Sequence, residues 1–176
     1  DAYTWNHLLA DGYCNYDNKE ANGLKYGRLY NWYAVTDSRQ LAPKGWHVST
    51  EEDWTTLINY LIANGYNYDK TKDDNRAAKS LAATTDWTTF IGTGAIGNDL
   101  KKNNSTGFSA LPGGCRSFSY PDATFDGLNI SSYWWSIVPD DIYSFPYGRS
   151  LVNNSSYVFR NTYSKQTGFY VRCVKD

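Results

Sequence analysis

The sequence predicts one α+β domain over residues 1–176, on the evidence of its length, one well-marked helix and a series of short strands. At 176 residues and 20.0 kDa, the chain is long enough to bury about two-thirds of its unfolded surface in one core. Helical signals end before about residue 105, and apolar or alternating runs separated by Gly, Asn and Ser follow. Helices and strands that are segregated along a chain are typical of the α+β class.

The first half of the chain, residues 1–114, is expected to form a scaffold. Its first 48 residues have the turn residues and short apolar runs of small strands, and residues 29–35 are the first convincing apolar run. A helix is predicted over 50–63, because Ser49 and Glu52 have the spacing of a capping box and apolar residues then recur at helical spacing. An Asn-Gly pair stops this helix.

A second helix is predicted near 74–84, and the chain is predicted to end in a strand over 168–176. Two Asp residues stand where that helix would start. Its apolar face consists of Ala77, Ala78, Leu81 and Ala82. The final strand is indicated by alternating apolar residues, among which Cys173 is expected to be buried.

Composition excludes several classes of function. The net charge of −1 and the isoelectric point near 6.1 leave no basic field for nucleic acid. No run of about 20 apolar residues spans a membrane directly, so we expect any signal peptide or lipid-attachment cysteine to lie upstream of Asp1. Three cysteines, Cys14, Cys115 and Cys173, allow at most one internal disulfide.

The segment from Cys115 to Tyr163 has an unusual composition. It contains no Lys, Glu or Gln, whereas the rest of the chain holds 15 of them, so an even spread would place about four here. Ser, Tyr, Asn, Asp and Phe are the frequent residues of the segment instead. Binding surfaces use these residues because Tyr offers a large amphipathic contact and Ser and Asn offer adaptable hydrogen bonds. The composition predicts a recognition surface within residues 115–166.

Several blocks of the sequence resemble the Fibrobacter succinogenes major paralogous domain family. They are KYGRLYNWYAV at 25–35, LAPKGWHVSTEEDW at 41–54, AAKSL at 77–81, NSTGFSALPGG at 104–114, YWWS at 133–136 and GFYVRCV at 168–174. The resemblance covers roughly residues 25–176. It implies a C-type-lectin-like fold of the formylglycine-generating-enzyme branch, with two helices packed on short antiparallel sheets and long C-terminal loops. It also implies a cell-surface or secreted protein, such as an outer-membrane lipoprotein of Bacteroidota-type bacteria or a phage-borne display protein.

The family's upstream Trp-Met-x-Glu-Asn strand is missing. Ala42 and Cys115 also stand where the family often has Cys and Tyr. A Cys14–Cys173 disulfide is one pairing that the resemblance leaves open.

Some members of this family resemble variable proteins of diversity-generating retroelements, in which a C-terminal segment is rewritten at adenines. An Asn codon changed at its adenines encodes many residues but never Lys, Glu, Gln, Met or Trp. Residues 115–163 lack these five except for Trp134 and Trp135, which belong to a family block. On this interpretation residues 115–166 are a variable ligand-binding segment. Its candidate binding residues are Cys115, Phe118, Tyr120, Asp122, Ile137, Val138, Asp141, Ile142, Phe145, Tyr147, Tyr157, Phe159, Asn161 and Tyr163.

Strand geometry makes one local prediction about this set. Tyr157, Phe159 and Asn161 alternate with Val158 and Arg160, and a period of two places the first three on one face. If the Ile, Val and Phe residues among the candidates are exposed, they would form an apolar patch of the kind that marks a partner site. Trp46, Trp54, Trp134 and Trp135 are expected to belong mostly to the core.

The predicted activity is binding of an unknown protein or glycan by a monomer, with no catalytic residues, metal or cofactor. The alternatives are a fixed carbohydrate-binding or adhesin-like fimbrial surface domain, and a formylglycine-generating-type oxidase, which needs two activated thiolates. His7 and His47 lack partners at metal-ligand spacing. The Asp pairs at 73–74 and 140–141 lack the ordered carboxylates of a calcium loop.

Overall fold

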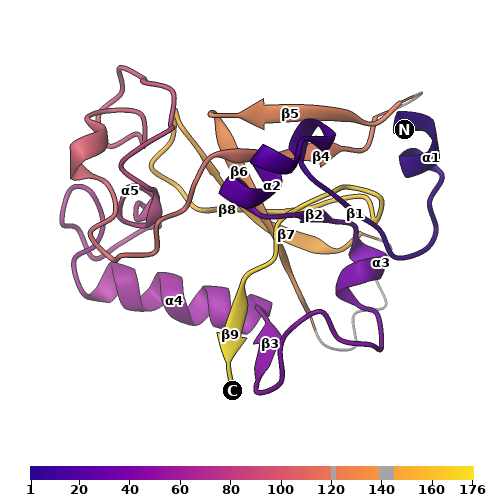
Figure 1. Ribbon diagram of the computed structural model, residues 1–176. Coiled ribbons are helices and arrows are strands. Elements are labelled where there is room, and N and C mark those ends of the chain that lie inside the picture. The colour runs from indigo at the N-terminus through magenta and orange to yellow at the C-terminus, as the bar shows by residue number, and fades with distance from the viewer. Residues whose placement is uncertain (120–121, 139–144) are drawn as a thin grey trace.

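The computed structural model describes residues 1–119, 122–138 and 145–176, and these ranges form the predicted α+β fold (Figure 1). The helices are α1 (Ala2–Asn6), α2 (Glu20–Tyr26), α3 (Trp32–Val35), α4 (Glu51–Ala63) and α5 (Ala78–Leu81), with 3-10 turns η1 (Tyr16–Asn18) and η2 (Leu100–Lys102). The strands are β1 (Tyr13–Cys14), β2 (Leu29–Tyr30), β3 (Trp46–Val48), β4 (Gly113–Ser117), β5 (Thr124–Leu128), β6 (Ser131–Ser136), β7 (Tyr147–Val152), β8 (Phe159–Thr162) and β9 (Cys173–Lys175). None of the described helices is long and apolar enough to cross a membrane.

A five-stranded sheet in the order β5-β4-β6-β7-β8 is the centre of the fold, and β1-β2 and β3-β9 are separate two-stranded sheets. Only the β4–β6 pair among these named strands is parallel. Its register sets Cys115 beside Tyr133. Antiparallel pairing sets Asp126 opposite Cys115, Tyr133 opposite Ser150, and Ser150 opposite Phe159. Since paired residues point to the same side of a sheet, these five side chains form a row across one face.

The helix predicted over 50–63 is confirmed as α4, but its cap lies one residue later than predicted. Thr50 and Asp53 form the capping box. Ser49 cannot cap because it is still part of the extended chain: its N–H donates to the carbonyl of Arg172, and its buried hydroxyl accepts a 3.0 Å bond from the indole of Trp54. The cap therefore follows the tertiary pairing of the chain before it.

The second predicted helix is much shorter than 74–84, because the residues before α5 are held by other parts of the chain. Asp74 has a left-handed backbone (φ 62°), which a helix cannot contain. The side chain of Asn75 bonds both the N–H and the carbonyl of Val158, and the N–H of Arg76 donates to Asn67. The apolar face is nevertheless buried, with Ala77, Ala78, Leu81 and Ala82 all in the core.

The first 48 residues contain more helix than predicted. The apolar run over 29–35 divides into β2 and α3, because the Asn31 side chain accepts a bond from the N–H of Ala34 and caps a helix there. Short helices α1 and α2 also form in this region, which had been predicted to hold turns and strands.

The predicted final strand over 168–176 is confirmed only at its end, where β9 pairs with β3. Before it, Phe169 forms a bridge with Tyr30, and Tyr170 forms one with Trp134. Both rings are therefore buried although they are adjacent, so the region does not alternate. Cys173 is partly rather than fully buried.

The core is built from aromatic rings that both halves of the chain supply. Trp54 on α4 lies 5.7 Å from Trp134 on β6, measured between ring centroids. Trp135 packs at 4.6 Å against Phe169 on the opposite side of β6. Of the tryptophans expected in the core, only Trp46 is exposed. All three cysteines are free thiols. The Cys14–Cys173 disulfide that the family resemblance left open is therefore not present.

Candidate functional site

A cavity of about 540 Å³, here called the sheet pocket, opens on the face of the five-stranded sheet that carries Cys115 and Tyr133. Strands β4, β5, β6 and β8 and the segment after β8 contribute its walls. The lining residues are Cys115, Ser117, Phe118, Asp126, Tyr133, Phe145, Thr162, Tyr163, Ser164, Thr167 and Phe169. Four of the predicted binding residues, Cys115, Phe118, Phe145 and Tyr163, meet here.

The chain after β8 closes one side of the sheet pocket. The N–H of Tyr163 donates to the carbonyl of Pro146, which continues the β7–β8 pairing by one residue beyond β8. The Tyr163 ring then stands edge-on to Phe169, with centroids 4.7 Å apart, and edge-on to Tyr133 at 6.2 Å. Gly148 makes this packing possible, because a Cβ there would lie 3.1 Å from the Tyr163 ring.

The sheet pocket is neutral except for one carboxylate. Burial, and to a lesser extent the charge of Asp126, raises the pKa of Cys115 to about 12. Burial also raises the pKa of Tyr133 and of Tyr163. The thiol and both phenols therefore stay protonated at neutral pH. Asp126 is the acidic side chain in the lining, and no Lys, Arg or His is among the lining residues in the described part of the chain.

The edge strand β8 and the residues before it present two further aromatic candidates. Tyr157 and Phe159 are 39% and 36% exposed, their ring centroids lie 6.4 Å apart, and Val158 between them is buried. This part of the predicted alternation is confirmed. The alternation ends there, since Arg160 and Asn161 are both exposed, as an edge strand allows.

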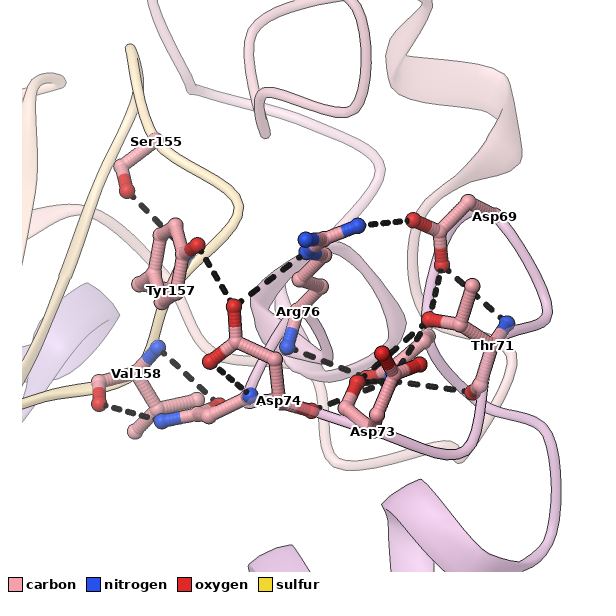
Figure 2. A network of polar contacts seen from close by, with 10 residues as sticks. Asp69, Thr71, Asp73, Asp74, Arg76, Ser155, Tyr157 and Val158 are labelled. Carbon is pink, nitrogen blue, oxygen red and sulfur yellow. Dashed lines mark hydrogen bonds and ion pairs between the residues drawn. The ribbon is translucent and has the colours of Figure 1, made fainter.

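Figure 2 shows how Tyr157 is held on the scaffold. Its hydroxyl donates a 2.8 Å hydrogen bond to Asp74, which is also paired with Arg76 at 3.4 Å. Arg76 in turn binds Asp69 at 2.6 Å. The hydrogen bond from Tyr157, followed by the backbone bond from Asn75, lowers the pKa of Asp74. A loop of the scaffold thus orients a side chain of the predicted recognition segment.

Tyr147 lies on the face of the sheet opposite to the sheet pocket. It and Arg149 alternate with Ser150 along β7. Its half-buried ring lies 3.7 Å beneath the guanidinium carbon of Arg160. Arg149 and Arg160 both bind Glu51 at the start of α4. Tyr147 therefore contributes to an ion-pair cluster that joins α4 to the sheet.

Other predicted residues lie outside the sheet pocket. Ile137 is half-buried and joins β6 to α4, because its N–H donates to Ser49 and its carbonyl accepts from Glu51. Val138 beside it is also half-buried, and Asp122 is exposed. Tyr120, Asp141 and Ile142 lie outside the described residues.

Sequence reasoning missed seven lining residues: Ser117, Asp126, Tyr133, Thr162, Ser164, Thr167 and Phe169. Tyr133 and Phe169 stand in blocks that carry the family resemblance and were interpreted as framework. Asp126 is brought to Cys115 only by the β4–β5 register. No local pattern marks the hydroxyl residues, because they become neighbours only when β8 returns to the sheet.

The described ranges contain no group of three His, Cys, Asp or Glu side chains that could hold a metal ion. His47 bonds Asp176 and Asp53 instead. At the Asp pair 73–74, which was considered above for calcium, Asp74 forms an ion pair with the guanidinium of Arg76.

The fold and the sheet pocket define an α+β domain with an aromatic cavity on one face of its main sheet. The chain belongs to the Fibrobacter succinogenes major domain family, whose sequence model matches residues 4–175. The match begins well before the blocks that first carried the resemblance. No curated protein and no solved structure matches the chain significantly.

Proposed function

We propose that this protein is a surface-displayed binding protein of C-type-lectin-like fold, and that the sheet pocket and the neighbouring edge of β8 are its recognition surface. The observation that carries this proposal is the convergence of Cys115, Phe118, Phe145 and Tyr163 on one cavity. These residues were selected from the sequence, and strand pairing brings them together from three different parts of the segment 115–166.

The pocket is suited to binding through shape and hydrogen bonds. Phe118 and Phe145 are exposed at its edge, where aromatic side chains typically anchor a partner. Neutral hydroxyls and the Asp126 carboxylate accept hydrogen bonds inside. A ligand group rich in donors, such as a basic or amide side chain or a sugar hydroxyl, therefore complements the pocket.

The thiols support binding without catalysis. Burial raises the pKa of Cys14, Cys115 and Cys173. Oxidase chemistry of the formylglycine-generating type requires thiolates, and a raised pKa removes them at neutral pH.

We further propose that residues 115–166 vary through a diversity-generating retroelement. Exposed candidates such as Phe118, Phe145, Tyr157 and Phe159 tolerate exchange, whereas Trp134 and Trp135, which adenine mutagenesis cannot produce from Asn codons, are buried. Cys115 and Ile137 are exceptions, since the first is buried and the second joins β6 to α4. Variation at these two positions should be restricted to side chains that keep the packing.

The decisive experiment is deep sequencing of the gene across its source population. Substitutions confined to adenines of the exposed candidate codons, over a constant 1–114 region, would establish the variable protein. A uniform substitution rate would leave a fixed binding domain.

A fixed glycan-binding or adhesin domain is the second candidate. The hydroxyls of Ser117, Thr162, Ser164 and Thr167 beside aromatic rings favour it, because sugars bind to such combinations. Glycan and protein arrays, probed with the wild type and with Phe118→Ala/Phe145→Ala, test whether the ligand is a glycan or a protein. Capture that is lost in the variant identifies the ligand class, and capture that persists would place recognition elsewhere.

A further inference from the structure

A second cavity, of about 460 Å³, lies on the other face of the sheet, where β6 presents Ser132 and Trp134 rather than Tyr133. Two separate blocks of the sequence meet there. Residues 25–30 contribute Lys25 and Arg28, and the segment before β9 contributes Arg172. None of these residues is in the predicted variable segment. We propose that this cavity, here called the basic pocket, binds an oxyanion, either a carboxylate or a phosphate, carried on a small polar ligand.

Two of the three positive charges of the basic pocket have no ion-pair partner within the described part of the protein. Lys25 pairs with Asp86. Neither Arg28 nor Arg172 forms a salt bridge with any described residue. The lining contains no Asp or Glu among the described residues. Two unneutralised guanidinium groups therefore border one cavity.

Both guanidinium groups are positioned by aromatic rings instead of carboxylates. The guanidinium carbon of Arg172 lies 4.5 Å from the centroid of the Phe108 ring, and one nitrogen donates a 3.2 Å bond to the Phe108 carbonyl. The guanidinium of Arg28 lies 4.6 Å from the Tyr13 ring. Such stacking fixes the plane of a guanidinium and leaves further N–H donors available. Planar guanidinium groups bind carboxylate and phosphate oxygens through paired hydrogen bonds.

Burial makes an anion at Arg172 more favourable. Burial lowers the pKa of Arg172, because the charged form has lost part of its hydration. An oxyanion would restore that lost interaction.

The remaining walls indicate a small polar ligand. Ser109 and Ser132 supply hydroxyls, and Tyr26 and Trp134 supply aromatic surface. Gly27 turns the chain at the edge of the cavity with a φ of 92°, which other residues adopt only with strain. The volume suits a ligand of the size of an acidic monosaccharide or a phosphate ester.

The test is a titration of the ¹⁵N-labelled protein with inorganic phosphate, with glucuronate and with neutral glucose, at constant ionic strength. We expect saturable amide shifts around Gly27, Ser109 and Arg172 with at least one anion, and none with glucose. Binding should weaken at least tenfold in Arg28→Gln and in Arg172→Lys. Lys101→Gln, which removes one positive charge from an exposed site outside the pocket, should bind like the wild type.

The two anions distinguish the source of the oxyanion. Tighter binding of glucuronate identifies an acidic sugar, and tighter binding of phosphate identifies a phosphate ester. If neither anion gives saturable shifts, or if Lys101→Gln weakens binding as much as Arg28→Gln, the assignment is wrong. Arg28 is exposed, so its variant decides the matter even if a substitution at Arg172 disturbs folding. Neither success nor failure of this titration bears on ligand capture by the sheet pocket, because that pocket lies on the opposite face of the sheet.

Discussion

The hydroxyl of Tyr157 donates a hydrogen bond to Asp74 over 2.8 Å, which links the edge of the sheet to a scaffold loop 83 residues earlier in the chain (Figure 2). Next to it, the side chain of Asn75 bonds the backbone of Val158. This edge of the sheet is therefore held by two side chains from one loop, Asp74 and Asn75. Such pre-organisation reduces the entropy that binding costs.

Removing both exposed rings of this edge should abolish binding without unfolding the protein. In Tyr157→Ala/Phe159→Ala we expect at least a tenfold loss of affinity for a ligand identified on the arrays. Stability should fall by only about 1 kcal/mol, because more than a third of each ring is already exposed. Surface plasmon resonance and urea denaturation measure the two effects.

Tyr60→Ala is the matched control, since Tyr60 is exposed on α4, away from this edge. It should retain full affinity. Loss of the folded state in the double variant would instead place Tyr157 and Phe159 in the core and overturn their assignment to the binding surface.

Glu51 should contribute far more stability than the exposed arginine it contacts. The side chain of Arg149 is 7% exposed and that of Glu51 is 14% exposed, so Glu51→Gln leaves a buried cation unpaired at a cost of about 3 kcal/mol. Arg160 is largely exposed, and Arg160→Gln should cost less than about 1 kcal/mol. Urea denaturation measures both values. Equal losses in the two variants would contradict this account.

The Glu51 contribution should also depend on pH. Burial acts to raise the pKa of Glu51, but the hydrogen bonds from Arg149 and Arg160 outweigh it and lower the pKa below its ordinary value of 4.5. A lowered pKa means that the stabilisation is present above about pH 4.5 and is lost as pH falls through the folded value. Glu52→Gln is the control in the same helical turn. It should cost less than about 1 kcal/mol, since Glu52 is exposed and contributes only to the first turn of the helix.

His47 should titrate above its ordinary pKa of 6.5. The carboxylate of Asp176, and then that of Asp53, raises the pKa of this imidazole through hydrogen bonds at 2.8 and 3.0 Å. The stabilisation that protonated His47 gives the folded state is complete below pH 6.5. It disappears as the pH rises through the raised pKa of His47 in the folded protein. An NMR titration of the ring protons measures the shift. Asp176→Asn should lower the pKa and the remote Asp73→Asn should not, and an unchanged pKa in Asp176→Asn would refute the assignment.

Cys115 should be the least reactive thiol. Burial raises its pKa to about 12, so almost no thiolate is present at neutral pH. We expect three thiols to react with Ellman's reagent in denaturant, and Cys115 to react slowest in the native protein. Cys115→Ser should remove that slow phase. Rapid modification of Cys115 in the native state would instead indicate an activated thiol and reopen the oxidase alternative.

The segment of unusual composition was predictable as part of the candidate site, whereas the neighbours that come from the sheet register were not. Phe118, Phe145 and Tyr163 belong to a segment with an unusual residue content, so they were recognised. Asp126 lies in the same segment, but nothing marks it as a candidate within that segment, and it reaches the pocket only because β5 pairs with β4. Tyr147 has the same chemistry as Tyr163, yet strand alternation turns it to the other face.

Local patterns in the sequence determined the α+β class, the position of α4 and the burial of Trp54, Trp134 and Trp135, because helical spacing and apolar runs act over short distances. Tertiary structure alone decided the length of α5, since Asn75 bonds Val158 and the N–H of Arg76 donates to Asn67, both outside the predicted helix. It also decided which face of the sheet received the aromatic pocket. Strand pairing joins segments far apart in the chain, and a shift of one residue would exchange the two faces.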